Sequence, residues 1–432
     1  MAKAPQSLTI RAYQVGFGDC FLLSFRYSAT SERHVLVDFG STGLPAGVPK
    51  TRMKDIALDI RKRTGGKLHA VIATHRHRDH ISGFATTAKG DGTGDIVRAL
   101  KPDVVVQPWT EDPDIATDGT GPGGTAAKPA NSKHVSMLAA MHGVAGQSLA
   151  ETRRLGRYLA KPMRDQLGFL GEDNILNPEA VKNLMAMGKA GKAAYVYHGS
   201  KSGLDAVLPG VAIDVLGPPT LKQSDAIRKE RASDPSEFWQ FQSRAMRFAQ
   251  AEGGHGEALF KRHVLSRGPG YPIGVRWLIF HARSARSNQL LQIVRVLDDA
   301  MNNTSVILLM EVNGKRLLFP GDAQIENWQY ALSRPDAKSL LGGVNFYKVG
   351  HHGSRNATPK SLWALFKNRS KTKGPDRLQS LMSTMAGKHG SPDKKSEVPR
   401  KTLVDALKEE TDLYSTQDLG AKTLYHESVI DF

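Results

Sequence analysis

Three histidines and one aspartate fall within six residues of this 432-residue chain, in the stretch His75-Arg-His-Arg-Asp-His80. Imidazole nitrogens and carboxylate oxygens are ligands that Zn²⁺ and related ions prefer in proteins. In an extended segment residues two apart point the same way, so His75 and His77 can hold one metal while Asp79 and His80 turn toward a second. The spacing therefore predicts a centre for two divalent metals and disfavours a surface cluster of histidines in a basic loop.

The element before this cluster must hold it in place. The apolar run from Ala70 to Ala73 predicts a buried strand that ends at Thr74, so the cluster lies in the loop at the carboxyl end of that strand. Open α/β sheets bind their ligands at this edge. Further elements are expected upstream, namely strands over residues 8–15, 21–25 and 34–40 and a helix over residues 53–63. Their order indicates an α/β fold.

A second carboxylate follows a predicted hairpin in the other half of the chain. Asn313-Gly314 separates two apolar segments and is a strong signal for a two-residue hairpin turn. Asp322 comes after the second segment and a glycine turn. A carboxylate in that place can bridge two cations with one oxygen on each, so we expect Asp322 to be the bridging ligand.

Two adjacent histidines follow another apolar strand, which runs from Phe346 to Val349. A neutral imidazole there would complete the ligands of the second metal, and its neighbour could face the substrate or fix the geometry of the site. We expect His352 to bind metal and His351 to be the catalytic or supporting partner, although spacing alone does not decide between them.

These motifs resemble those of the metallo-β-lactamase-fold hydrolases. The first signature is the cluster from His75 to His80, followed by the small pair Ser82-Gly83. Within that superfamily the chain is most similar to the ComEC-type branch, through segments 15–20, 302–308, 319–323 and 348–354. The first of these looks like the branch's Val-Gly-Gln-Gly-Asp-Ala turn, with Phe17 where Gln is usual. The resemblance covers roughly residues 8–110 and 300–425.

The resemblance implies an αββα sandwich, a metal-activated water and phosphodiester chemistry. Two divalent metals are expected, with Zn²⁺ as the first choice and Mn²⁺ as the alternative. Asp79 would both bind the second metal and orient the nucleophile. Lys348 and Ser354 could join His351 in contacting the substrate or protonating a leaving group, but packing is an equally good explanation for them. Asp19 and Asp38 are expected to form turns or to orient ligand histidines.

Two positions depart from the branch's pattern. Ser391 stands where the branch has a histidine, although His389 lies close enough to substitute. The superfamily often supplies a third histidine to the first metal, and we prefer His198 because it follows a short predicted strand. The other candidates are His134, His142, His255, His263 and His281. Fewer protein ligands and more water at the first metal are the alternative.

The formal net charge of +17 and a pI near 9.8 favour anionic partners, with nucleic acid among them. The densest basic segment, residues 360–401, holds eleven Lys or Arg against three acids. Such a segment is either a solvated face or a patch that follows phosphates beside the site.

We expect a single metallo-β-lactamase-like domain over residues 1–432 with a largely helical cap inserted over residues 112–288. Short strands near residues 194–197 and 211–216 lie inside this insertion, which could be a lid over the substrate or simple structural elaboration. The single cysteine, Cys20, borders an apolar segment and is expected to pack as a small hydrophobe. A membrane segment is not expected, so the chain is interpreted as cytoplasmic. The sequence leaves the oligomeric state open.

Three functions are consistent with these features. The leading one is a metal-dependent phosphodiesterase or nuclease. The second is a small-molecule hydrolase, such as a lactonase, thioesterase or phosphorylcholine-type esterase, which an apolar pocket under the insertion would favour. The third is a metal-bearing binding module, which the full set of ligands disfavours.

Overall fold

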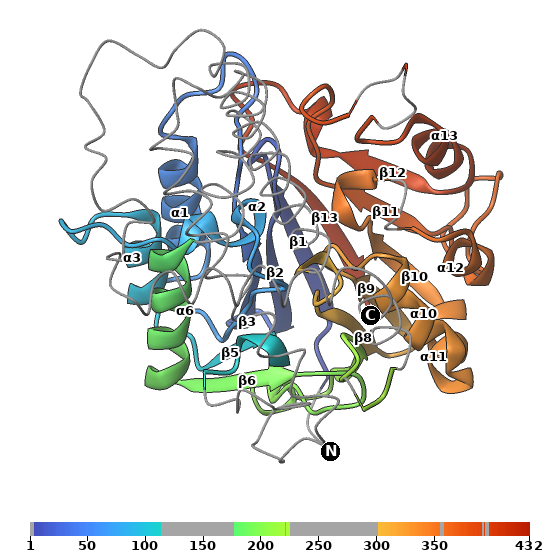
Figure 1. The fold of residues 1–432 in the computed structure, drawn as a ribbon, viewed down its shortest axis with the longest axis horizontal. Coiled ribbons are helices and arrows are strands. Elements are labelled where there is room, and N and C mark those ends of the chain that lie inside the picture. Colours follow the sequence, from blue (N-terminus) through green and yellow to red (C-terminus); the bar gives the residue numbers. More distant parts are fainter. Residues whose placement is uncertain are drawn as a thin grey trace, which may run out of the picture.

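The computed structural model describes residues 4–113, 177–220, 222–224, 301–354, 358–390, 393 and 397–432. Over these residues two β-sheets pack face to face, and helices cover the outer face of each sheet (Figure 1). The mixed α/β architecture is the αββα sandwich that the sequence predicts, and it is consistent with a metallo-β-lactamase fold.

The first sheet has seven strands in the order β13-β1-β2-β3-β4-β5-β6. They are β1 (Ser7–Tyr13), β2 (Cys20–Ser28), β3 (Ser31–Phe39), β4 (Ala70–Ile72), β5 (Val104–Pro108), β6 (Lys192–Val196) and β13 (Tyr425–Asp431). Strands β3 to β6 run parallel to one another, whereas β13, β1, β2 and β3 pair antiparallel. The helices α1 (Arg52–Arg63), α3 (Thr93–Ala99) and α6 (Pro178–Ala190) pack on its outer face.

The second sheet has six strands in the order β12-β11-β10-β9-β8-β7. They are β7 (Ala212–Gly217), β8 (Ile307–Val312), β9 (Lys315–Phe319), β10 (Val344–Lys348), β11 (Gln379–Met382) and β12 (Asp412–Ser415). The helices beside it are α10 (Ile325–Ser333), α11 (Pro335–Gly342), α12 (Lys360–Leu365) and α13 (Lys401–Glu410). The predicted hairpin is confirmed between β8 and β9, because Asn313 and Gly314 both have positive φ, at 47° and 82°.

Strand β2 shows how the sequence builds two hydrophobic layers at once. Phe21 and Phe25 point into the core between the sheets, while Leu22 points into the core under the outer helices. Successive side chains of a strand point to opposite faces, so a strand that is covered on both sides reads as a continuous apolar run. Phe21 meets Phe319 of the other sheet edge to face, with ring centroids 6.5 Å apart. Cys20 is fully buried in the layer under the helices, which confirms the prediction for this residue.

The predicted insertion over residues 112–288 needs a correction in its middle. Strand β6 pairs with β5 in the first sheet and β7 pairs with β8 in the second, and α6 packs under the first sheet. Residues 178–217 therefore belong to the sandwich itself, because each of these strands needs a sheet partner to satisfy its backbone. Residues 114–176 and 225–300 lie outside the described residues, and a cap formed by them stays a prediction. Among the described helices, none combines the length and the apolar character needed to cross a membrane.

Two buried histidines at the amino end of β4 should make the stability of the fold depend on pH. The backbone N–H of His34 donates to His69 Nδ1 at 3.0 Å, so this ring nitrogen must be unprotonated. Burial lowers the pKa of both imidazoles from 6.5 to about 4, and neighbouring arginines lower it further. As pH falls from 6.5 to 4, these two imidazoles bind protons in the unfolded chain but stay neutral in the folded chain. The free energy of unfolding therefore decreases across this window.

We expect His69→Asn to reduce this loss of stability, because an amide oxygen can accept the same hydrogen bond without titrating. Urea midpoints of both proteins, measured in chelator from pH 7.5 to 4.5, would check this. Equal slopes of stability against pH in the two proteins would contradict the expectation.

Candidate metal centre

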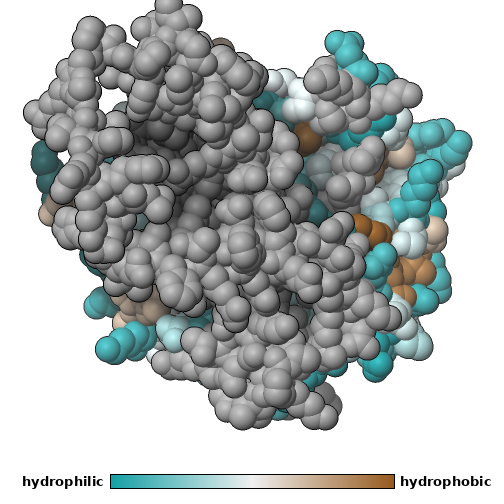
Figure 2. All heavy atoms as spheres, in the orientation of Figure 1, coloured by the Kyte–Doolittle hydropathy of each residue, from teal (hydrophilic) through white to brown (hydrophobic). Residues whose placement is uncertain are grey.

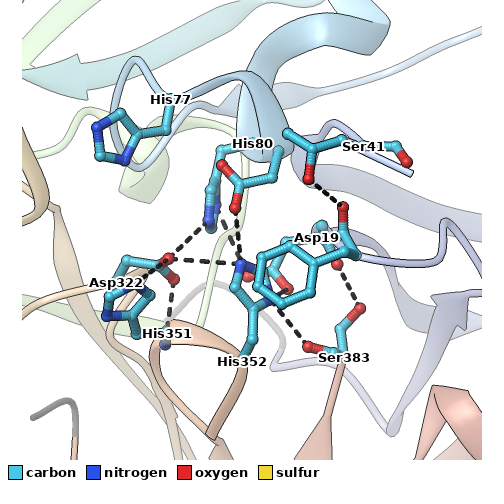
Figure 3. Close-up of polar contacts among 12 residues, drawn as sticks. Asp19, Ser41, His77, His80, Asp322, His351, His352 and Ser383 are labelled. Atoms are coloured by element: carbon cyan, nitrogen blue, oxygen red, sulfur yellow. Dashed lines mark hydrogen bonds and ion pairs between the residues drawn. The ribbon is translucent and has the colours of Figure 1, made fainter. Parts of the chain in front are cut away.

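The loops that follow β4, β9 and β10 meet and bring together side chains that are far apart in sequence (Figure 3). Asp79 and His80 lie on the short helix α2 (Arg78–Ile81), Asp322 follows β9, and His352 lies in the turn η6 (His351–Gly353). His352 Nε2 lies 2.9 Å from Asp79 Oδ2, although the two residues are 273 positions apart. The three strands end at the same edge of the sandwich, so the polar residues of the loops that follow them lie close together there.

Four of the predicted ligands form one buried group. Asp79, His80, Asp322 and His352 each offer one donor atom, and these atoms all lie within 4.8 Å of one another. His80 Nε2 lies 3.1 Å from Asp322 Oδ2, and His352 Nε2 lies 3.5 Å from the same oxygen. Asp79 Oδ1 is buried and accepts no hydrogen bond from the described residues. A divalent cation would satisfy that oxygen and the converging nitrogens, so the donor set fits a metal.

His75 and His77 form a second pair of nitrogens beside this group. His75 Nε2 and His77 Nδ1 lie 3.0 Å apart, and the rings of His75 and His80 have centroids 4.2 Å apart. Burial lowers the pKa of His77 to about 4 and that of His75 well below its usual value. Both imidazoles are therefore neutral at neutral pH, which is the state that a metal ligand needs.

Asp38 holds His80 in its orientation. His80 Nδ1 donates to Asp38 Oδ2 at 2.8 Å, and the same carboxylate accepts from the backbone N–H and the hydroxyl of Thr74 at 2.7 and 2.8 Å. With Nδ1 engaged, Nε2 points at Asp322. A carboxylate behind a ligand histidine fixes the tautomer and strengthens the ligand, which is the supporting role predicted for Asp38.

The two adjacent histidines have different surroundings. His352 is fully buried, and its Nδ1 donates to the carbonyl of Ser383 at 2.9 Å, which leaves Nε2 for the four-donor group. His351 lies at the rim with its side chain 27% exposed, and its Nδ1 lies 3.0 Å from the hydroxyl of Ser354. The arrangement puts His352 in the place expected of a ligand and His351 where a substrate would reach it.

For Lys348 the sequence left two explanations open, contact with the substrate or packing. Its side chain is buried beneath the cluster, where the ammonium group pairs with Asp19 and lies 3.6 Å from Asp322 Oδ1. Burial opposes its charge, but Asp19 and Asp322 outweigh burial and raise the pKa of Lys348. A group so enclosed cannot contact a substrate, so packing is the explanation that fits this residue. The signal in the sequence was the strand itself, since Lys348 ends a strand whose neighbouring Phe346 and Tyr347 are both buried.

A comparison with known families suggests a class for this site. Residues 13–129 match the metallo-beta-lactamase superfamily. The matched segment contains β2 to β5 and the whole loop from His75 to His80. The superfamily consists largely of hydrolytic enzymes that bind divalent metals, often zinc, so a metal-dependent hydrolase is the coarse function that it suggests. No curated protein matches the chain.

His198, the third histidine predicted for the first metal, follows β6 and makes contacts of its own. His198 Nδ1 donates to the carbonyl of Leu216 at 2.9 Å, and its ring meets Tyr330 with centroids 4.9 Å apart. It borders a cavity of about 380 Å³ whose lining includes none of the other predicted ligands. The N–H of Gly199 donates to the carbonyl of Val215 in β7 at 2.9 Å, and the N–H of His198 donates to the carbonyl of Pro218 just after β7 at 2.8 Å, so two backbone hydrogen bonds hold this turn. The other five candidate histidines lie outside the described residues.

An aromatic wall borders the centre on another side. The ring of Phe17 has its centroid 4.3 Å from that of His352 and 4.4 Å from that of His389. Burial lowers the pKa of His389 to about 4, while the charge of Asp79 acts in the opposite direction. His389 therefore lies near the cluster, where the sequence suggested that it could replace the histidine missing at Ser391. Ser391 itself lies outside the described residues.

Gly40 lets α2 approach the end of β3 closely. A Cβ at this position would lie 2.3 Å from the carbonyl carbon of Asp79 and 2.4 Å from the backbone nitrogen of His80. Backbone atoms cannot give way as a flexible side chain can, so Gly40→Ala must shift α2 and both of its ligands. We expect the affinity for the second metal to fall at least ~10-fold, the scale seen when ligand orientation is lost.

Competition with a chromogenic chelator would measure this effect of Gly40→Ala. Gly374→Ala is the matched control, because a Cβ there meets nothing within 4 Å. An unchanged metal affinity in Gly40→Ala would show that the close approach does not position the ligands.

Proposed function

We propose that this protein is a metal-dependent phosphodiesterase or nuclease of the ComEC-type branch, with two divalent metals, Zn²⁺ first and Mn²⁺ as the alternative. The observation that carries the proposal is the buried convergence of Asp79, His80, Asp322 and His352, with the neutral pair of His75 and His77 beside it. Nucleic acid as partner and the cytoplasm as location belong to the same proposal.

The residues divide between two metal positions that share Asp322. His75 and His77 would hold the first metal, and Asp79, His80 and His352 would hold the second. Bound there, two divalent cations would lower the pKa of a water toward ~7 and stabilise charge on a substrate oxygen.

Asp79 and His351 would then act on the water and on the substrate. Asp79 would bind the second metal through one carboxylate oxygen, which would leave the other to orient the attacking water. His351 lies at the exposed rim, where it can donate a proton to the leaving oxygen of the substrate. The hydroxyl of Ser354 holds its ring in place.

The charge distribution narrows the part of the surface that would contact phosphate. Five basic side chains of segment 360–401 form ion pairs with acids, which reduces their value as a phosphate patch. These pairs are Arg369–Glu410, Lys371–Glu409, Arg377–Asp412, Arg400–Glu397 and Lys401–Asp405. The surface near α13 is mainly hydrophilic (Figure 2). Lys388 is exposed and adjoins His389, whose pKa responds both to Lys388 and to Asp79, so it lies on the side of the surface nearest the centre.

A paired activity screen tests the proposal. Metal-replete protein would be assayed on bis(p-nitrophenyl) phosphate and single-stranded DNA, and in parallel on a lactone and thioester panel. We expect turnover of the phosphodiesters, loss of it in Asp79→Ala, and weaker DNA binding in Lys388→Ala than in Lys401→Ala, which changes an exposed lysine on α13. Cleavage of the carbonyl substrates alone would replace the proposal by a small-molecule hydrolase. Full phosphodiesterase activity in Asp79→Ala would exclude this centre as its source.

A further inference from the structure

The first metal position has fewer protein ligands than the second. Among the described residues, no histidine, cysteine, aspartate or glutamate beyond those already named joins the donor groups around the centre, apart from Asp19 and Asp38 behind His80. His75 and His77 share two anionic neighbours, Asp322 and Asp79, and Asp79 is already assigned to the second metal. Because this point concerns the ligands of one metal, the inference below rests on the proposed two-metal function.

One amide side chain lies against this incomplete position. Asn302 is only 3% exposed, and its side chain lies within hydrogen-bonding reach of His77. No hydrogen bond of ordinary geometry reaches Asn302 Oδ1 within the described part of the chain. A buried carbonyl oxygen that lacks a donor is unfavourable, and a cation beside it would remove the penalty.

The backbone holds Asn302 next to both ligand loops. The carbonyl of Asn302 accepts from the N–H of Ser305 at 3.0 Å, which forms a tight turn before β8. The N–H of Val306 donates to the carbonyl of Thr74 at 2.9 Å, directly before His75. The hydroxyl of Ser305 accepts from the N–H of Asp322 at 3.2 Å. The turn is thus tied to the loop of His75 and to the bridging aspartate.

We propose that Asn302 Oδ1 is the third protein ligand of the first metal, in place of a third histidine. The exchange has a chemical consequence. Amide oxygens are harder ligands than imidazoles and suit Mn²⁺ as well as Zn²⁺, so the first position is the weaker and less zinc-selective of the two.

Metal titration of the full chain tests this assignment. Zn²⁺ and Mn²⁺ would be titrated into metal-free protein by calorimetry, and bound metal would be counted by mass spectrometry after dialysis. We expect two binding steps in the unaltered protein. Asn302→Ala should weaken the weaker step at least ~10-fold and leave the stronger step unchanged. Asn302→His should restore that step for Zn²⁺ and raise its preference for Zn²⁺ over Mn²⁺.

Matched variants separate the possible outcomes. Asn303→Ala is the control, because its neighbouring amide donates to Glu326 Oε2 at 2.9 Å and it should leave both steps unchanged. Loss of the weaker step in His198→Ala, or two unchanged steps in Asn302→Ala, would overturn the assignment. If Asn302→Ala does not fold without metal, Asn302→His alone tests the assignment. A raised preference for Zn²⁺ over Mn²⁺ at the weaker step would support it, and an unchanged preference would overturn it. No metal binding by the unaltered protein would instead refute the two-metal function itself.

Discussion

Replacing Asp322 with alanine is expected to empty both metal positions and to lower hydrolytic activity on the order of 10³-fold. Asp322 Oδ2 lies between His80 Nε2 and His352 Nε2, at 3.1 and 3.5 Å, while Oδ1 accepts from the N–H of His351 at 3.1 Å. Burial opposes its charge, but His80 and His352 outweigh burial and keep the pKa of Asp322 well below its usual value. The carboxylate is therefore charged at any pH suitable for an assay.

Two measurements would check the Asp322→Ala expectation. The metal-to-protein ratio after dialysis should fall toward zero, and kcat should fall on whichever substrate the screen identifies. Asp376→Ala is the control, since this exposed carboxylate pairs with Lys315 at the surface. A variant that keeps two metals would show that Asp322 does not bridge them.

Replacing Lys348 with methionine is expected to destabilise the fold by about 3–5 kcal/mol. Methionine fills the space of the aliphatic stem but leaves Asp19, which is fully buried, without its cationic partner. Asp19 also lies 3.6 Å from His352 Nδ1 and 3.7 Å from His80 Nδ1. An uncompensated carboxylate at this depth would therefore disturb the metal ligands as well as the fold.

Urea denaturation of the metal-free proteins would measure this loss. Lys371→Met, which removes an exposed partner of Glu409, should change the unfolding midpoint little. The double variant Asp19→Asn/Lys348→Met removes both charges and should regain part of the stability lost in Lys348→Met. An unfolding midpoint for Lys348→Met equal to that of the parent would contradict the role assigned to the buried pair.

Local signals were sufficient where a few neighbouring residues set the structure. The hairpin turn at Asn313-Gly314 needs positive φ at two adjacent positions, and asparagine and glycine are residue types that adopt positive φ readily. The loop from His75 to His80 follows a short apolar strand, so its place at the carboxyl end of that strand could also be predicted. The αββα class followed from such segments together with the resemblance that they carry.

Contacts between residues distant in sequence explain the places where the structure adds to or differs from the predictions. β6 and β7 looked like parts of an inserted cap, but each completes a sheet with partners distant in sequence. His198 follows a strand, as the prediction supposed, yet the pairing of that turn with β7 directs it toward Tyr330. Nothing in the local sequence distinguishes these arrangements, because the choice depends on which strands lie next to each other.

The sequence by itself therefore determined the kind of chemistry, since the types and spacing of His75, His77, Asp79 and His80 are those of a metal centre. The sequence also predicted Asp322 and His352 as ligands, and only the tertiary structure decided whether these distant groups lie beside the cluster. It placed Asp322 and His352 among the donors, enclosed Lys348 with Asp19 beneath them and brought Asn302 against His77. The physical reason is that the ability of a residue to bind metal depends on the chemistry of its own side chain. Whether that side chain is buried, and what lies next to it, depends on how the two sheets pack.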